Sequence, residues 1–131
     1  RTAPFGLPRR LRLRKRKAFL RLQRMGTRGN RPTCTVVLRY VPVGQEKIGL
    51  TVSKKVGNAV VRNRIKRRLR HILRTKPELY RNYELNVIAH PKAKDASFLE
   101  IEKDVWSAFS HAQKKCKQRV KRTHPSKGKV S

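Results

Sequence analysis

Acidic residues are scarce in this chain of 131 residues, which has 7 Asp and Glu against 36 Lys and Arg and a formal net charge of +29. No acidic residue precedes Glu46 and none follows Asp104. A chain with this excess repels itself unless a polyanion neutralises it, and phosphate contacts are the usual use of so many cations. A membrane surface fits less well, because the basic segments lack the broad apolar face that interfacial helices bury. We therefore expect a nucleic acid as the partner.

Cysteines and long apolar runs are scarce as well. Cys34 and Cys116 are far apart, and neither has a histidine at ligand spacing, which argues against structural zinc. We expect both to be reduced core thiols. No apolar run approaches the ~20 residues of a membrane helix, and the first residues have no apolar stretch typical of a secretory signal. These absences predict a cytoplasmic protein, and the length suits one domain.

Hydrophobic periodicity predicts three helices and at least three strands. Residues 14–25 should form a helix that ends at Gly26, and residues 27–32 a turn or a short edge strand. Residues 33–41 and 47–53 alternate like strands and have a connection of hairpin length, so we expect an antiparallel pair. Next along the chain we expect a helix over 59–74, a strand over 83–90, and a helix that starts at the capping box of Ser97 and Glu100. This order predicts an α+β sandwich with one open sheet face.

The ends of the chain are expected to differ from its middle. Residues 1–12 contain prolines and arginines, a composition that predicts a flexible basic arm. Residues 13–121 should form the single RNA-binding α+β domain, and residues 122–131 a basic, disordered tail.

The sharpest local signal is the segment SKKVGNAVVRNRIKRRLR, residues 53–70. A strand ends there, Gly57 and Asn58 make a turn, and a helix begins whose free amides can attract an anion. Arg62 is placed to clamp a phosphate, and Asn63 can both donate and accept hydrogen bonds, which suits a ribose or a base edge. Six of the nine residues in 62–70 are basic, so we favour binding over a merely solvated helix face.

KKVGNAVVRNRIKRRLR closely resembles the signature of the bacterial ribonuclease P protein subunit, whose core is the triplet Arg62, Asn63 and Arg64. The stretch LRLRKRKAFLRLQRMG is similar to the first helix of that family. VVLRYV and KIGLTVSKK resemble its sheet, and YELNVIAHPKAKDASF resembles its last strand and turn. The resemblance covers residues 11–120 in the expected order.

The resemblance implies a fold and a mechanism. The fold is an α-β-β-β-α-β-α sandwich with a mainly antiparallel four-stranded sheet and a left-handed β-α-β crossover, although such crossovers are right-handed in ~98% of cases. A large RNA subunit is the catalyst of the family. It hydrolyses one phosphodiester bond of precursor tRNA with Mg²⁺ that is held mainly by RNA. The chain itself is expected to carry no catalytic residue, no metal and no obligate protein partner.

Two sets of binding residues follow from the resemblance. The residues expected to contact the catalytic RNA are Lys54, Lys55, Asn58, Arg62, Asn63, Arg64, Lys66, Arg67 and Arg70. A cleft between the first helix and the open sheet face is expected to hold the single-stranded 5′ leader of precursor tRNA. Its expected residues are Arg14, Lys15, Phe19, Gln23, Arg39 and Tyr40.

Three details of the expected cleft depend on the exact side chains. Gln23 stands where the family usually has a second aromatic, so we expect hydrogen bonding in place of stacking there. Phe19 is equally compatible with stacking on a base and with a place in the core. Because neighbouring residues of a strand face opposite ways, we expect Arg39 to face the cleft and Tyr40 to lie in the core.

Other functions are less consistent with these residues. The candidate bases and metal ligands of a nuclease carried by the protein itself are His71, His90, His111, His124, Asp95 and Asp104. None of them forms a catalytic set by spacing. We expect Asp95 in the turn before the last helix, Asp104 as a surface acid on that helix, and His71 facing solvent or RNA. A structural ribosomal protein and a regulator of double-stranded DNA remain the alternatives, and neither explains the resemblance along the chain.

Overall fold

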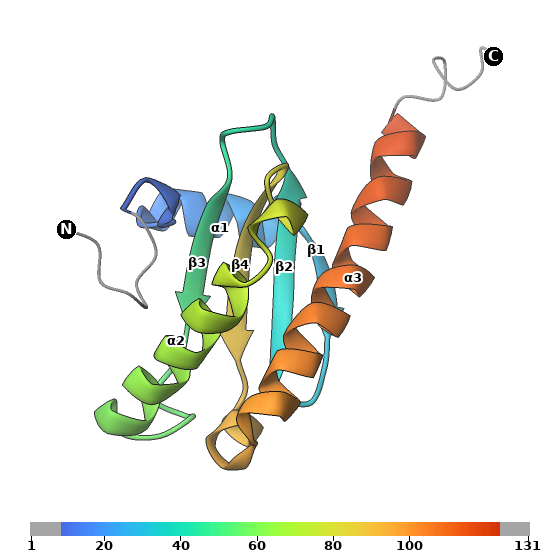
Figure 1. The fold of residues 1–131 in the computed structure, drawn as a ribbon. Helices are drawn as coiled ribbons and strands as arrows, with labels where there is room; N and C mark the ends of the chain where they lie inside the picture. Colours follow the sequence, from blue (N-terminus) through green and yellow to red (C-terminus); the bar gives the residue numbers. More distant parts are fainter. Residues whose placement is uncertain (1–8, 124–131) are drawn as a thin grey trace.

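The computed structural model describes residues 9–123 and places three helices and four strands in this range (Figure 1). The elements are α1 (Arg16–Met25), β1 (Thr27–Asn30), β2 (Cys34–Tyr40), β3 (Lys47–Thr51), α2 (Ala59–Arg74), β4 (Tyr83–Ala89) and α3 (Phe98–Thr123). Short 3-10 turns occupy Arg9–Leu11, Pro77–Leu79 and Pro91–Asp95. The predicted edge strand after Gly26 is therefore confirmed as β1. No helix in the described range is long and apolar enough to cross a membrane.

The described range extends past both predicted domain boundaries. Leu11 is buried, Arg12 forms a β-bridge with Ile48, and the amide of Leu13 donates to the carbonyl of Ile48 at 2.8 Å. The chain before α1 thus runs parallel to β3 and covers its edge. At the other end α3 continues through Thr123. The remaining residues of the predicted arm, 1–8, and of the predicted tail, 124–131, lie outside the described range.

The sheet has the order β1-β2-β4-β3. The β1/β2 and β2/β4 pairs are antiparallel, whereas β3 and β4 are parallel. The α+β class and the mainly antiparallel sheet are confirmed. The predicted antiparallel pairing of the strands at 33–41 and 47–53 is wrong, because β4 lies between β2 and β3. β4 is one of the two interior strands of the sheet. Its Leu85 and Val87 are completely buried on one face, and its Glu84 is buried on the other.

The connection from β3 through α2 to β4 has the unusual hand. In Figure 1 both strands run downwards, β4 lies to the right of β3, and α2 passes in front of the sheet. This path is a left-handed crossover, as the resemblance implied and against the general preference.

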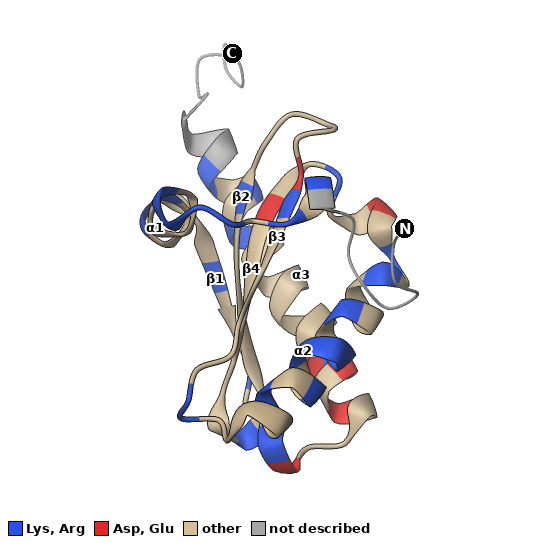
Figure 2. Ribbon diagram, turned by 90° about the vertical axis from the view of Figure 1, so that its left-hand side faces the viewer, with Lys and Arg blue, Asp and Glu red and all other residues tan. Residues whose placement is uncertain are grey.

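Helices cover the sheet on both faces. α2 and α3 lie on one side and α1 lies on the other, as the view in Figure 2 shows. The larger core joins Ile65, Leu69 and Ile72 of α2 to α3 and to the sheet residues Val36 and Leu85. The helix predicted over residues 59–74 is thereby confirmed. The smaller core, under α1, consists of Leu13, Leu22 and Val37. The sheet face expected to be open is therefore partly covered.

The predicted capping box and the predicted core cysteines are both present in the structure. The amide of Glu100 donates to Ser97 Oγ at 3.1 Å and the amide of Ser97 donates to Glu100 Oε1 at 2.8 Å, which confirms the capping box. Cys34 and Cys116 are free and buried. Burial, with a smaller effect of the Asp104 carboxylate, raises the pKa of the Cys34 thiol to about 12. Cys34 therefore stays a neutral, unreactive thiol at physiological pH.

Candidate nucleic-acid interface

One face of α2 gathers the cations of the central motif. Asn63, Arg64 and Arg67 are exposed, while Arg62, Lys66 and Arg70 are partly buried. Lys54 and Lys55 are exposed in the turn that precedes the helix. Figure 2 shows the blue bands of Lys and Arg along α2. The residues expected to bind the catalytic RNA therefore lie on one helix and the turn before it.

The start of α2 is capped by its own chain. The side-chain oxygen Oδ1 of Asn58 accepts a hydrogen bond from the amide of Val61 at 3.0 Å. This N-cap satisfies one of the helix amides, so the helix start is less open to an anion than the motif suggested. The side-chain NH₂ of Asn58 takes no part in this cap and can donate to RNA.

Two arginines tie α2 to the turn before α3. Arg64 Nη2 donates to the carbonyl of Lys94 at 3.1 Å, and Arg68 Nη1 donates to the carbonyl of Ala96 at 3.3 Å. Neither contact neutralises its arginine, because a backbone carbonyl has no net charge. The Nε of Arg62 is buried and has no hydrogen-bond partner within residues 9–123. An unpaired buried donor is costly, and a phosphate oxygen is the kind of acceptor that would relieve it.

A groove lies on each side of α1, at opposite ends of β3 and β4. The smaller one, about 190 Å³, is lined by Phe19, Leu22, Gln23, Val37, Thr51, Asn86 and Ile88, and we name it the Phe19 groove. The larger one, about 610 Å³, is lined by Arg12, Leu13, Arg14, Lys15, Ala18, Arg21, Lys47 and Glu84, and we name it the Glu84 groove. In the parallel register Lys47 pairs with Glu84 and Thr51 with Ile88, so the grooves meet the two strands at their starts and at their ends.

Phe19 belongs both to the small core and to a groove wall. It packs against the core of Leu13, Leu22 and Val37 and also lines the Phe19 groove. Its ring lies directly on β3, since a Cβ added to Gly49 would be 2.6 Å from Phe19 Cε1. Gln23 is exposed in the same groove. A ring held in this way needs no reordering to accept a base, and the stacking itself stays a prediction.

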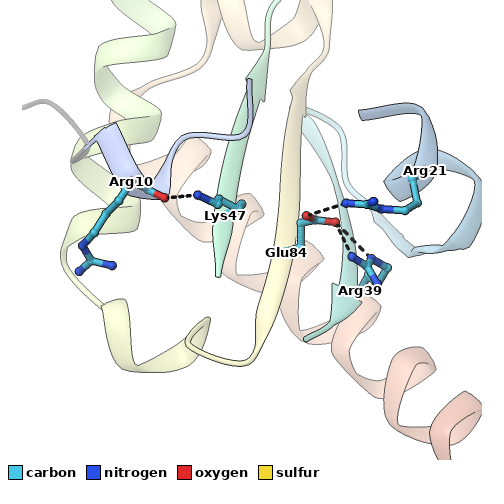
Figure 3. Close-up of polar contacts among 5 residues, drawn as sticks. All are labelled: Arg10, Arg21, Arg39, Lys47 and Glu84. Atoms are coloured by element: carbon cyan, nitrogen blue, oxygen red, sulfur yellow. Dashed lines mark hydrogen bonds and ion pairs between the residues drawn. The ribbon is translucent and has the colours of Figure 1, made fainter. Parts of the chain in front are cut away.

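Glu84 is the centre of the second groove, and sequence reasoning missed it. It is 5% exposed. Its Oε1 accepts from Arg39 Nε at 3.1 Å, with Arg39 Nη2 also at 3.1 Å, and its Oε2 lies 3.6 Å from Arg21 Nη2 (Figure 3). A signal existed in the sequence, because Glu84 is the one charged residue in the apolar strand YELNVIA. Arg39, which was expected to face the leader cleft, contacts Glu84 and is not among the residues that line either groove.

The residues predicted for one leader cleft are therefore divided. Phe19 and Gln23 line one groove, and Arg14 and Lys15 line the other. The prediction that Tyr40 lies in the core is wrong, because Tyr40 is 54% exposed. Tyr40 is the last residue of β2 and packs edge-on against Tyr83, with ring centroids 5.9 Å apart.

The candidate nuclease residues are spread over the structure. Asp104 is not the simple surface acid that we expected, since its Oδ2 accepts from the amide of Thr33 at 3.1 Å and from Thr33 Oγ1 at 2.6 Å. Asp95 ends the turn before α3, as predicted. His71 is exposed beside Phe98, and His124 lies outside the described range. Among residues 9–123 no group of three or more His, Cys, Asp or Glu is placed to hold a metal ion.

A family model described as Ribonuclease P matches residues 7–113. The chain belongs to the ribonuclease P protein family. The match contains the triplet Arg62, Asn63 and Arg64 and every residue that lines the two grooves.

Relatives within the ribonuclease P protein family cover the chain to different extents. The ribonuclease P protein component of Thermus thermophilus is 43% identical over 95 residues, which are 71% of this chain and 54% of that protein. The component from Kocuria rhizophila is 39% identical over 114 residues, 84% of this chain and 98% of that protein. The chain thus spans about half the length of the Thermus relative and nearly all of the Kocuria relative.

Solved ribonuclease P proteins share the fold. The protein of Staphylococcus aureus superposes with a TM-score of 0.70 at 28% identity, covering 82% of this chain and 92% of that one. The protein of Thermotoga maritima gives a TM-score of 0.65 at 25% identity, covering 72% and 91%. The family match and the shared fold agree over the same domain.

Proposed function

We propose that this chain is the protein subunit of a bacterial ribonuclease P, acting in the cytoplasm. It binds the catalytic RNA and the single-stranded 5′ leader of precursor tRNA, and it assists endonucleolytic removal of the leader to give the mature tRNA 5′ end. The observation that supports this proposal is the family match over residues 7–113, a range that includes the triplet Arg62, Asn63 and Arg64 of α2.

The basic face of α2 is the proposed contact with the catalytic RNA. Its cations lie on one rigid helix, which is anchored by the buried Ile65, Leu69 and Ile72. The helix therefore presents the backbone of Arg64 and Arg67 at fixed positions, so only their side chains have to be ordered on binding. Guanidinium groups bind phosphates through two parallel hydrogen bonds, which suits a backbone contact with structured RNA.

The Phe19 groove is the proposed place for the leader. A narrow groove between a helix and a sheet admits a single strand. Phe19 offers an aromatic face for a base, and Gln23 and Asn86 offer amides that donate and accept hydrogen bonds. These groups read bases weakly, so we expect the groove to hold leaders of varied sequence.

The chemistry is assigned to the RNA subunit. Hydrolysis of a phosphodiester with Mg²⁺ needs several oxygen ligands close together, and the described part of the chain brings no three acidic, histidine or cysteine residues together. We therefore propose that RNA phosphates hold the Mg²⁺. The protein contributes positive charge and holds the leader in position on the catalytic RNA.

Arg64→Ala tests the contact of α2 with the catalytic RNA. The loss of one phosphate contact should weaken binding about tenfold and reduce the slope of log K against log salt by about 1. Binding of the catalytic RNA is measured by filter retention between low and moderate salt. Arg81→Ala, which removes an exposed arginine in the turn before β4, is the matched control and should leave the slope unchanged. An unchanged slope for Arg64→Ala would count against this role of α2.

A further inference from the structure

A strip of hydrogen-bond donors lies at the edge of the sheet where α3 packs beside β1 (Figure 1). Its members are Arg28 of β1, Arg31 of the segment that follows, and His111, Lys115 and Arg119 of α3, and we name it the β1–α3 strip. The three residues of α3 are exposed, and the other two are partly buried. One end of the strip lines a groove of about 380 Å³. The strip shares no residue with the two grooves beside α1 or with α2.

Two cations of the strip are oriented by backbone carbonyls. Lys115 Nζ donates to the carbonyl of Arg28 at 2.8 Å, and Arg119 Nη1 donates to the carbonyl of Met25 at 2.5 Å. The first contact covers the outer edge of β1, which a lysine commonly protects from pairing with other strands. Both carbonyls are uncharged, so neither contact neutralises the side chain that it holds.

Arg31 joins the segment after β1 to α3 and fixes His111. Its Nε donates to Ser107 Oγ at 2.6 Å, and its Nη2 lies 3.1 Å from His111 Nδ1. A guanidinium has donors only, so Nδ1 accepts this hydrogen bond and the ring proton lies on Nε2. His111 therefore adds an N–H donor to the strip.

The strip has the chemistry of a phosphate site and lacks that of a base-binding site. Its five members all present donors, and both ion pairs of the described residues belong to Glu84, which lies outside it. No acidic residue follows Asp104 in the sequence, so the charged residues in the second half of α3 are all basic. The groove at the end of the strip has no aromatic residue in its lining, so a base finds no ring to stack on. Such a strip fits the phosphates of a folded, base-paired RNA.

We propose that the β1–α3 strip is a second docking surface for the catalytic RNA, separate from α2, where it binds phosphates of a base-paired segment. The proposal rests on the proposed function, which supplies the identity of this RNA. Arg28 and Lys115 make phosphate contacts at the groove, and Arg31 positions His111 beside them.

The position of the strip favours the catalytic RNA over precursor tRNA. α2 and α3 cover the same face of the sheet (Figure 2), whereas the Phe19 groove proposed for the leader lies on the face under α1. β1 and β3 are the two edge strands, and the four strands span roughly 14 Å. An RNA docked on α2, which follows β3, therefore has to extend across the sheet to reach the strip. A large folded RNA does so while the opposite face stays open to the leader.

The test uses the full chain with Arg28→Gln and Lys115→Gln combined. Glutamine removes the charge and keeps an N–H donor, so the edge of β1 can still be covered. Each phosphate contact with a duplex contributes about 0.9 to the slope of log K against log salt. We therefore expect the double variant to lose about 1.8 of slope and at least tenfold in affinity for the catalytic RNA. The matched control combines Lys103→Gln and Lys117→Gln, which remove two exposed cations of α3 outside the strip, and it should lose less than twofold.

Two single variants separate the charge of Lys115 from its packing. Lys115→Arg keeps both the charge and a donor and should retain the slope of the parent chain, whereas Lys115→Gln should lose about 0.9 of slope. These variants also carry the test if the double variant does not fold. An equal loss of slope for both would overturn the phosphate contact of Lys115.

Binding of precursor tRNA to the preassembled complex of chain and catalytic RNA identifies the occupant of the strip. The double variant, assembled at low salt, should bind precursor tRNA as its control does. A loss confined to precursor tRNA would overturn the assignment to the catalytic RNA, and a double variant that matches its control with both RNAs would overturn the strip as a binding surface. In either case, tight binding of the catalytic RNA by the parent chain leaves the proposed function standing. A parent chain that does not bind this RNA overturns both proposals.

Discussion

Gly29→Ala is expected to lower the free energy of unfolding by about 3 kcal/mol, because overpacking of a buried contact costs roughly 1–3 kcal/mol or more. A Cβ at this position would lie 2.0 Å from the carbonyl oxygen of Ala108 and 2.8 Å from its carbonyl carbon. Both are backbone atoms of α3, so no side-chain rotation relieves the clash. β1 and α3 would have to separate and lose the buried hydrogen bond from Thr27 Oγ1 to the carbonyl of Ala112 at 2.7 Å.

Urea unfolding followed by circular dichroism measures this effect. Gly44→Ala is the matched control, since Gly44 has a φ of 93° and a Cβ there would meet nothing within 4 Å. It should cost about 1 kcal/mol through backbone strain alone. Equal urea midpoints for Gly29→Ala and the parent chain would show that β1 does not pack on α3 as described.

Glu84→Gln is expected to lower the free energy of unfolding by about 2 kcal/mol, because hydrogen bonds to charged groups contribute roughly 1.5–3 kcal/mol each. The substitution keeps the shape of the side chain and removes its charge. Arg39, which approaches Glu84 Oε1 with two nitrogens at 3.1 Å, then loses its ionic partner in a place largely screened from water. An exposed ion pair would contribute only about 0–1 kcal/mol, and the burial of Glu84 distinguishes the two cases.

Double-mutant cycles with Arg39→Gln and Arg21→Gln separate the two contacts of Glu84. We expect the coupling to Arg39 to exceed the coupling to Arg21, since Arg21 is half-exposed and farther away at 3.6 Å. Salt should weaken the Arg21 coupling more strongly. A coupling to Arg21 that equals or exceeds the coupling to Arg39 would contradict this account of the network.

The helices and the central motif were predictable because their signals are local. The helix over residues 59–74 and the capping box of Ser97 and Glu100 depend on spacings of three and four residues, and both appear in the structure as predicted. The basic face of α2 follows from the same periodicity. Its predicted role in binding comes from charge and from family resemblance.

Strand pairing and the grooves depend on contacts between distant segments. The short connection between β2 and β3 favours a hairpin, and only the insertion of β4 from residues 83–89 decides otherwise. Glu84 gains its role because Arg21 and Arg39 come from other elements. The division of the expected cleft into two grooves arises because α1 lies across the sheet. The residue pattern of one segment does not show which distant segments it will contact.

The two faces of the sheet have separate tasks in this account. The face under α2 and α3 contains the larger core and holds the helix proposed to dock on the catalytic RNA. The face under α1 has a small core, and the Phe19 groove beside it is the proposed site for the single-stranded leader.

Cleavage of precursor tRNA by a bacterial ribonuclease P RNA at low Mg²⁺, with and without this chain, tests the central claim most directly. The account predicts that the chain restores cleavage at the correct 5′ end and that it cleaves nothing by itself. Failure to restore cleavage, together with tight binding to ribosomal RNA, would favour a structural ribosomal protein instead. Cleavage by the chain alone would contradict the assignment of the chemistry to RNA.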